Sequence, residues 1–261
     1  MDILVIGDAH AKPGVSNRRF TWLGKLICAV QPDVVVDIGD FADMPSLSSY
    51  DGSKLTGSNS PKRSFEGASY KKDIEASVEA RDRVHVELQK AGRKRPRRIA
   101  LGGNHDDQRI SRALENVREL EGVISVADHQ REAYGWEHIP FLDAIEVGGF
   151  LFSHYYVSGS KGQPVSGEHP AANLLKTQHT SCVAGHSHMF NEAHRTSANG
   201  KRIQAFVAGC YLDPQQKEHY AGPANWMWSK GLLLMRDVDG GLARGGFEWI
   251  PIGKIMKEFS E

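Results

Sequence analysis

Three short apolar runs, each stopped by a glycine and followed by a polar residue, constrain the fold of this chain most strongly. They cover residues 3–6, 34–38 and 99–101, and the polar residues that follow are Asp8, Asp40 and Asn104. Short apolar runs bounded by glycine are typical of buried strands. Apolar residues at helical spacing over 18–30 predict a helix between the first two runs. The chain therefore begins with a parallel strand–helix–strand unit, and sheets of this kind place their sites at the carboxyl ends of the strands.

The second half of the chain is rich in predicted strands. Apolar runs predict strands over 144–147, 150–153, 181–184, 203–207, 232–236 and 247–251. Helical periodicity predicts helices over 71–91, 109–121 and 171–179. Gly148-Gly149, between two of the strands, is typical of a hairpin turn. With 261 residues, 40% of them hydrophobic, the chain can bury a substantial core, and we take residues 1–261 as one domain.

A long segment, about residues 44–70, breaks this pattern. It is rich in Ser, Gly, Lys and Pro and shows little periodicity, so we expect an inserted loop. It follows Asp40 and leaves the same edge of the sheet as that residue. Its basic residues are candidates to bind a substrate phosphate, with a merely solvated loop as the alternative; they are Lys54, Lys62 and Arg63.

The densest charge run, residues 93–98, is a weaker signal for binding nucleic acid. Lys+Arg and Asp+Glu both number 32, so the formal net charge is zero and no global field attracts a polyanion. The run also precedes the strand at 99–101, and the polar motif lies at the other end of that strand. We therefore expect a solvated loop or helix end here, on the edge away from the site.

The chain shows no feature of a membrane protein. No apolar run approaches the ~20 residues needed to cross a bilayer. The first predicted strand starts almost directly after Met1, which leaves no room for a signal peptide. We expect a cytoplasmic protein with no membrane partner.

Five motifs carry side chains that bind metals. They are Gly7-Asp8-Ala9-His10, Gly39-Asp40-Phe41-Ala42-Asp43, Gly103-Asn104-His105-Asp106, Ser153-His154 and Gly185-His186-Ser187-His188. Carboxylate and amide oxygens mixed with imidazole nitrogens suit Mn, Fe, Zn or Ni. Asp8 and His10 would share one face of a continuing strand, and Asp40 could bridge two metals through its two oxygens. Two metals so placed can clamp a phosphate and activate a water that attacks phosphorus.

These motifs, in this order, resemble those of the calcineurin-like metallophosphoesterases. The resemblance spans residues 7–188 and implies an α/β fold, in which a two-sheet β-sandwich is flanked by helices in four layers, α/β/β/α. It implies two divalent transition-metal ions, with Mn expected first and Fe, Zn or Ni as alternatives. It assigns one metal to Asp8, His10, Asp40 and His188. It assigns the other to Asp40, Asn104, His154 and His186.

The resemblance also implies how the reaction proceeds. A metal-bridging hydroxide would attack the phosphorus of a phosphoester. His105 matches the general acid that protonates the leaving oxygen, and Asp43 matches the carboxylate that orients it. Independently, an alkoxide leaving group needs a proton, and a histidine can supply one near neutral pH.

Two positions near the motifs depart from the family or leave their role open. His154 is followed by Tyr155, where the family has glycine, and Tyr155 could narrow the site or stack on a substrate. His169 and His179 are the alternatives should His154 not bind metal. Arg109 could reach a phosphate oxygen, or it could pair with Asp106 or Asp107.

Phosphoester hydrolysis, by a phosphatase or a phosphodiesterase, is the function these residues favour. The alternatives are a nuclease acting on DNA or RNA and a non-catalytic binding module. The substrate could be a nucleotide, a nucleic-acid end or a phosphoprotein, and the oligomeric state stays open. Several aromatic residues could stack on a base, although aromatics in β-rich segments are usually core; they are Tyr155, Tyr156, Tyr211, Trp226 and Trp228.

Overall fold

A six-stranded sheet carries the amino-terminal motifs. The computed structural model describes residues 1–48, 69–92, 95–160 and 162–260. The strands of this sheet are β1 (Ile3–Ile6), β2 (Val34–Asp37), β3 (Arg97–Leu101), β4 (Glu137–Ile139), β12 (Gly231–Met235) and β15 (Phe247–Pro251). They lie in the order β15-β12-β1-β2-β3-β4, and β1 to β4 are parallel. The carboxyl ends of β1, β2 and β3 therefore meet at one edge, as predicted.

A second sheet of five strands faces the first. Its strands are β5 (Ile145–Val147), β6 (Phe150–Phe152), β9 (Cys182–Ala184), β10 (Phe190–Thr196) and β11 (Arg202–Ala208). They lie in the order β10-β11-β9-β6-β5, and β6, β9 and β11 are parallel. Two small hairpins complete the β structure: β7 (Val157–Ser158) with β8 (Gln163–Pro164), and β13 (Val238–Asp239) with β14 (Leu242–Ala243).

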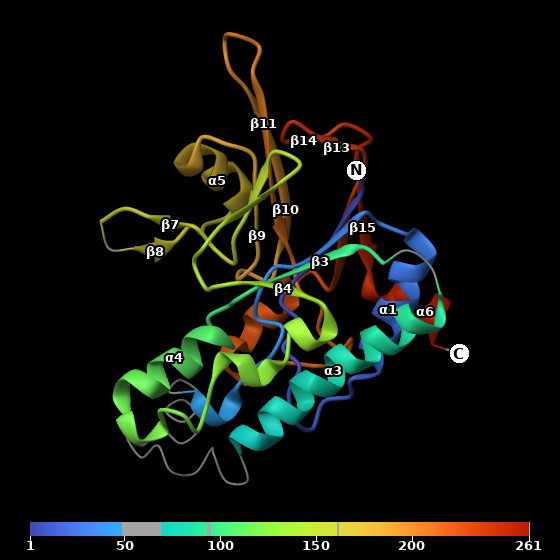
Figure 1. Cartoon of the computed structure of the whole chain (residues 1–261). Coiled ribbons are helices and arrows are strands. Elements are labelled where there is room, and N and C mark those ends of the chain that lie inside the picture. The colour runs from blue at the N-terminus through green and yellow to red at the C-terminus, as the bar shows by residue number, and fades with distance from the viewer. Residues whose placement is uncertain (49–68, 93–94, 161, 261) are drawn as a thin grey trace.

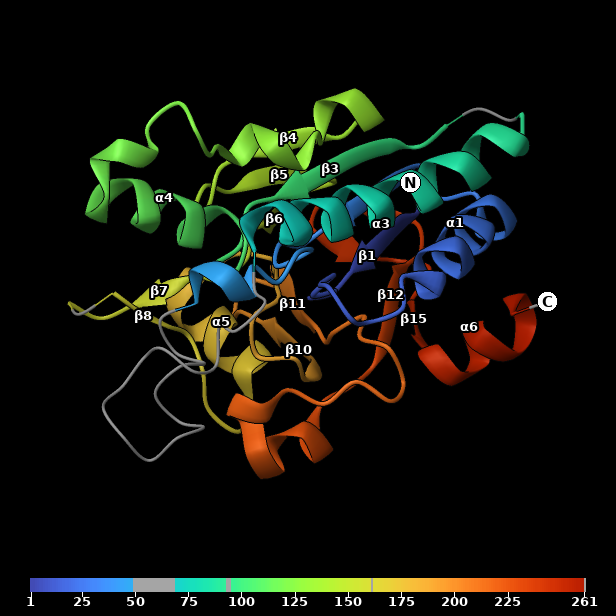
Figure 2. The same ribbon diagram turned by 90° about the horizontal axis from the view of Figure 1, so that it is seen from below.

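The two sheets pack face to face, and helices cover their outer faces (Figures 1 and 2). Buried aliphatic and aromatic side chains from both sheets fill the space between them, among them Val5, Val36, Phe150 and Phe206. The helices α1 (Arg18–Val30), α3 (Tyr70–Lys90) and α6 (Ile252–Phe259) pack on the six-stranded sheet. Helix α5 (Pro170–Gln178) packs on the other sheet. The predicted four-layer α/β/β/α sandwich is confirmed.

The connections after β3 contain most of the remaining helical structure. They comprise α4 (Asp107–Asn116) and the 3-10 helices η2 (Arg118–Leu120), η3 (Val126–His129) and η4 (Glu132–Tyr134). The predicted helix over 109–121 was wrong at both ends. Asp106 accepts a hydrogen bond from the Asp107 backbone N–H and starts α4 two residues earlier, and Val117 is extended, which ends it.

The basic run and the inserted segment differ in part from expectation. Arg97 and Arg98 belong to β3, and Arg98 is only 8% exposed, so a solvated loop was wrong for these two residues. They lie at the opposite end of β3 from Asn104, as expected. The predicted loop over 44–70 contains η1 (Pro45–Leu47), and α3 already begins at its last residue. Lys54, Lys62 and Arg63 lie outside the described residues.

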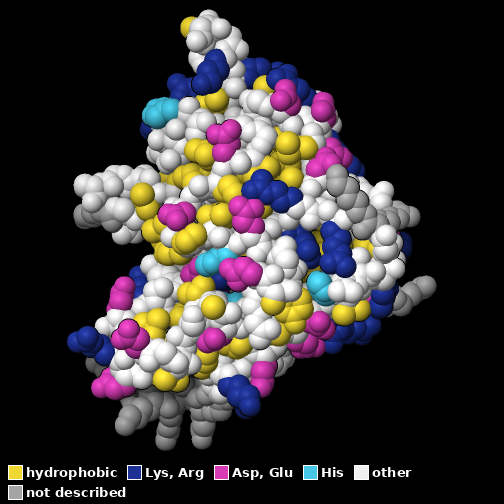
Figure 3. All heavy atoms as spheres, viewed as in Figure 1, with side chains coloured by type: hydrophobic (Ala, Val, Ile, Leu, Met, Phe, Trp, Pro, Cys, Tyr) yellow, Lys and Arg dark blue, Asp and Glu magenta, His cyan; other side chains and the backbone are white. Residues whose placement is uncertain are grey.

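The surface and the helices fit the composition. On the face that Figure 3 shows, acidic and basic side chains of the described residues are interspersed. None of the described helices is both long and apolar enough to cross a membrane.

Candidate metal centre

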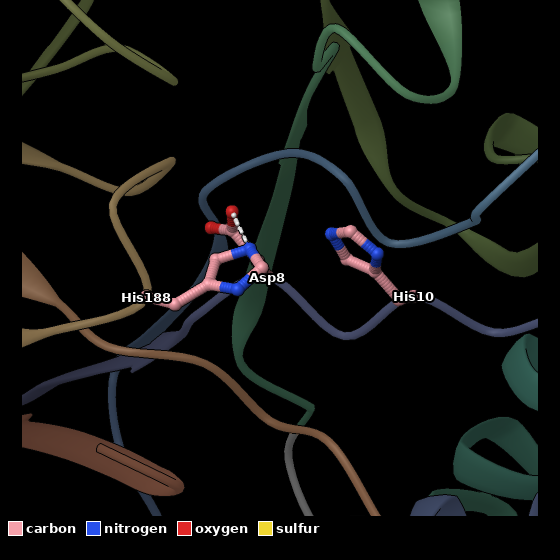
Figure 4. A group of neighbouring side chains, drawn as sticks. All are labelled: Asp8, His10 and His188. Carbon is pink, nitrogen blue, oxygen red and sulfur yellow. Dashed lines mark ion pairs between the residues drawn. The ribbon is translucent and has the colours of Figure 1, made fainter. Parts of the chain in front are cut away.

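Asp8, His10 and His188 form one group of possible metal donors. Asp8 and His10 directly follow β1, and His188 lies in the turn after β9. All three are nearly fully buried, and one donor atom from each lies within 4.8 Å of the others. The Nε2 of His188 is 3.0 Å from Oδ2 of Asp8. Figure 4 shows Asp8 and His10 on the segment that follows β1 and His188 on a separate loop, with the ion pair between Asp8 and His188 as a dashed line.

Asp40, His154 and His186 form a second group, with Asn104 beside them. The Oδ1 of Asn104 lies 2.9 Å from Nε2 of His154 and 2.8 Å from Nδ1 of His186. Nδ1 of His154 lies 3.0 Å from the carbonyl oxygen of Ile38. Because a carbonyl oxygen can only accept, Nδ1 is the donor in this hydrogen bond. The proton of a neutral His154 therefore lies on Nδ1, and Nε2 points its lone pair at the amide and carboxylate oxygens.

Asp40 borders both groups. Its Oδ2 lies 3.3 Å from Nε2 of His154 and 3.8 Å from Nε2 of His10. Its Oδ1 accepts a hydrogen bond of 2.7 Å from the backbone N–H of His105. Asp40 is thus held at the position that a bridging ligand would need.

The backbone around both groups adopts conformations that residues other than glycine rarely adopt. The φ angles of His10, Asp40, His186 and His188 are +46°, +52°, +67° and +59°. Such angles in residues other than glycine are uncommon and gather at functional sites. Close packing adds to this constraint, because a Cβ at Gly103 would lie 2.0 Å from Oδ1 of Asp40.

The charges and unpaired atoms of these groups fit divalent cations. Both ring nitrogens of the buried His10 lack a hydrogen-bond partner among the described residues, which is costly unless they bind something else. Burial lowers the pKa of His154, but Asp40, together with the charges of Asp8 and Asp106, raises the pKa to about 10. The same negative charges favour a metal cation at this position. Carboxylate, amide and imidazole donors together suit Mn, Fe, Zn or Ni.

His105 and Asp43 form a hydrogen-bonded pair beside the two groups. Nδ1 of His105 lies 2.9 Å from Oδ1 of Asp43, and the His105 and His10 ring centroids are 4.4 Å apart. Arg109 donates to the same Asp43 oxygen at 2.6 Å, and Nζ of Lys12 lies 3.2 Å from the other. Burial lowers the pKa of His105, but the charges of Asp40 and Asp43 outweigh it and raise the pKa above its ordinary value. This environment favours the protonated histidine that a general acid requires.

Three buried arginines lie behind the strand ends that carry these residues. Arg19 donates to the carbonyl of Ala9 at 2.8 Å, between Asp8 and His10 in the chain. Arg81 pairs with Asp37 at 3.0 Å, just before Gly39-Asp40.

Arg131 is the third, and it contacts the residues that follow Asn104 and His105. It pairs with Asp106 at 3.2 Å and with Asp107 at 2.7 Å. The three arginines are at most 2% exposed. Each guanidinium therefore fixes one of the three motif loops to the interior.

The other candidate residues named from the sequence include His169, His179 and Arg109. His169 and His179 are exposed at the two ends of α5, whereas His154 is fully buried in the second group. Arg109 pairs with Asp43 and not with Asp106 or Asp107, which was the alternative to its contact with a phosphate. Those carboxylates instead pair with Arg131, which no sequence pattern linked to them.

Aromatic side chains flank two of the histidines. The Tyr155 ring lies 4.9 Å from His186 and 5.5 Å from Phe141. Tyr211 is fully buried and Tyr156 nearly so, as the core alternative predicts. Trp228 lies edge-on to His188, with ring centroids 4.2 Å apart.

Sequence reasoning missed two charged residues of this site. Lys12 bridges Asp43 and Glu218, with Nζ 2.6 Å from the Glu218 carboxylate. Lys12 could have been noticed, because it follows His10 by two residues. Glu218 had no signal, because its contact with Lys12 joins positions 206 residues apart.

Comparisons with known proteins give one family match and several distant structural matches. Residues 1–203 match the family described as calcineurin-like phosphoesterase. Similar solved structures include Yfce, a phosphoesterase from E. coli, with 13% identity, a TM-score of 0.37 and coverage of 91% of this chain and 89% of that chain. The Pseudomonas putida nuclease MPE has 12% identity, a TM-score of 0.39 and coverage of 87% of this chain and 86% of that chain.

A dimetal phosphatase from Danio rerio has 12% identity, a TM-score of 0.39 and coverage of 97% of this chain and 99% of that chain. No curated protein matches the chain. Similarities this distant carry no argument about function, so the assignment rests on the family match.

The family match identifies a hydrolase that acts on phosphoesters. The chain belongs to the calcineurin-like phosphoesterase family.

Proposed function

We propose that this protein hydrolyses a phosphoester with two divalent transition-metal ions. The observation that carries the proposal is the pair of adjacent donor groups with Asp40 between them. Asp8, His10, Asp40 and His188 would hold one ion. Asp40, Asn104, His154 and His186 would hold the other. When bound, the ions would bind phosphate oxygens and lower the pKa of a water so that it becomes a nucleophile near neutral pH.

In this proposal His105 supplies the proton for the leaving oxygen. Its Nδ1 faces Asp43, so the other ring nitrogen is the one that gives up a proton. Asp43 fixes the ring orientation and supports the charged form. Arg109 and Lys12 hold Asp43 in place from two further directions.

Mn²⁺ is the ion we propose first, with Fe, Zn and Ni as alternatives. The donor set is rich in hard oxygens and imidazoles, and no described cysteine belongs to either group. The substrate would be a nucleotide, a nucleic-acid end or a phosphoprotein. Both monoesters and diesters present the phosphate oxygens that such a centre binds.

The test is metal-dependent hydrolysis by purified protein stripped with a chelator. Added Mn²⁺ should restore hydrolysis of p-nitrophenyl phosphate, of bis(p-nitrophenyl) phosphate, or of both. Asp40→Asn should lose most of this activity, whereas His194→Ala, an exposed histidine on β10, should retain it. Folded wild-type protein that hydrolyses neither ester with Mn, Fe, Zn or Ni would overturn the proposal.

A further inference from the structure

An exposed aromatic tip adjoins the candidate metal centre. It consists of Trp226, Met227 and Trp228, at the end of η5 (His219–Met227). Trp226 is 82% exposed and Met227 is 67% exposed. Figure 2 shows this segment, in orange, at the lower edge of the view. Scattered apolar residues are normal on a surface, but two large neighbours so exposed are informative.

The tip is connected directly to the centre. The Trp228 ring contacts His188 edge-on at 4.2 Å, and the backbone N–H of Ser229 donates to the His188 carbonyl at 2.9 Å. Trp226 precedes Trp228 by two residues, so the Cα atoms of the two residues are at most about 7 Å apart. A group attached to a phosphate at the centre could therefore extend over the tip.

Polar contacts hold the tip firmly, although Trp226 and Met227 face solvent. Asn225 accepts from the backbone N–H of Glu218 at 2.9 Å and donates to the carbonyls of Glu218 and Gly222, both at 2.8 Å. The Glu218 carboxylate pairs with Lys12, in the same loop as His10.

A second lysine, Lys230, fixes the residues that precede η5. Nζ of Lys230 donates to the carbonyls of Asp213, Pro214 and Gln216 at 2.7–3.2 Å. A surface held in place loses little conformational entropy when a flat ligand covers it.

We infer that this tip binds the base of a nucleotide whose phosphate lies at the metal centre. The inference rests on the proposed function, because the metal centre must hold the phosphate. An indole ring offers a flat apolar face on which any base can stack. Trp226 is then a residue that determines specificity, favouring nucleotide esters over sugar phosphates and phosphoserine.

The experiment compares two ligands that differ only in the base. Calorimetry on Mn²⁺-loaded protein would measure binding of adenosine 5′-monophosphate and of ribose 5-phosphate. The wild type should bind the nucleotide at least about fivefold more tightly, the lower limit of measured base–aromatic stacking. Trp226→Ala should remove this preference and leave ribose 5-phosphate binding unchanged. Trp226→Phe should retain most of it, and Val123→Ala, at an apolar residue 68% exposed elsewhere, should have no effect.

The possible failures are distinguishable. Equal binding of both ligands by the wild type would overturn this inference and leave the proposed hydrolysis intact. Absence of binding by either ligand would count against the metal centre itself. A Trp226→Ala variant that changes the sedimentation coefficient but not the nucleotide preference would assign the tip to contact with a second copy, which also overturns the inference.

Discussion

At the scale of single residues, Asp43 connects most of the site. One of its oxygens contacts His105 and Arg109, and the other contacts Lys12. Burial raises the pKa of the Asp43 carboxyl, but the hydrogen bond with His105 and the charges of His105, His10 and Lys12 together hold the pKa well below its usual value. A carboxylate that stays charged can orient His105 and support its protonated form throughout the neutral range.

His105→Ala should lower turnover by ~10²–10⁴ while metal content stays near the wild-type value. The physical reason is that His105 donates a proton and is not proposed as a metal ligand. The defect should shrink for p-nitrophenyl esters, whose leaving group needs little protonation. Equal defects for alkyl and nitrophenyl esters would contradict the acid role. Asp43→Asn should give a milder version, since it weakens only the orientation and charge support of His105.

At the scale of elements, the loops after β1, β2 and β3 depend on the buried arginines. Arg131 illustrates this, because it contacts two carboxylates at the start of α4 while lying 2% exposed. Asp106 in turn accepts from the backbone N–H of Gly103 at 2.6 Å. Asn104 and His105 are therefore positioned by a charge network that does not itself face the substrate.

Arg131→Leu should lower the free energy of unfolding by ~3–5 kcal/mol, because it leaves buried carboxylates without their partner. The matched control is Arg97→Leu, whose ion pair with Glu137 is roughly half exposed. Arg97→Leu should lower the free energy of unfolding by at most ~1 kcal/mol. Urea unfolding measures both. Similar losses for the two variants would show that the buried network does not hold these loops.

The inserted segment carries a prediction that rests on its sequence. Neutralising Lys54, Lys62 and Arg63 together should raise KM for a polyanionic substrate, with an effect that weakens at high salt. Hydrolysis of a small ester should change little, because that ester contacts mainly the centre. The comparison set is the basic run Arg93, Arg95, Arg97 and Arg98; of these, Arg97 and Arg98 begin β3, away from the site. If only this second set impairs the polyanionic substrate, the substrate lies elsewhere than we propose.

Elements with continuous apolar runs were predictable, and exposed or very short ones were not. Strands β1, β2 and β12 are buried on both faces, so their sequences carry a clear apolar signal. Strand β10 is a half-exposed edge strand with mostly polar residues, and β4 has only three residues. Neither offers a pattern that distinguishes a strand from a loop. Strand β4 also pairs with a strand distant in the sequence, β3.

The same distinction applies to the site. The predicted donors could be named because they follow strands in short motifs, and the structure brings them into two adjacent groups. Their partners Arg131 and Glu218 could not be found this way. Both meet the site through tertiary contacts, and no local spacing reports such contacts.

At the scale of the whole molecule, buried ionisable groups couple stability to pH. Burial lowers the pKa of His129 to about 3, and its Nε2 has no hydrogen-bond partner in the described part of the chain. The unfolded chain, with a histidine pKa near 6.5, therefore binds more protons than the folded chain between these values. His129 should make the protein less stable as the pH falls from about 6.5 toward 3.

The variant that tests this coupling is His129→Asn. It should be less stable than the wild type at pH 7, because the buried ring is lost. The difference should narrow steadily between pH 6.5 and 4, by a few kcal/mol, because only the wild type must then protonate a histidine on unfolding. Chemical unfolding at a series of pH values measures it. A difference that stays constant over this range would show that His129 does not control the acid limb.

The metal content of the reconstituted protein tests the central claim most directly. Elemental analysis after loading with Mn²⁺ and removal of loosely bound metal should approach two ions per chain. The His188→Ala and His186→Ala variants should each approach one ion per chain, because each removes a donor from a different group. The Asp40→Asn variant should reduce the metal bound at both groups. Folded wild-type protein that retains no more than one ion, with these three variants unchanged from it, would contradict the two-metal account.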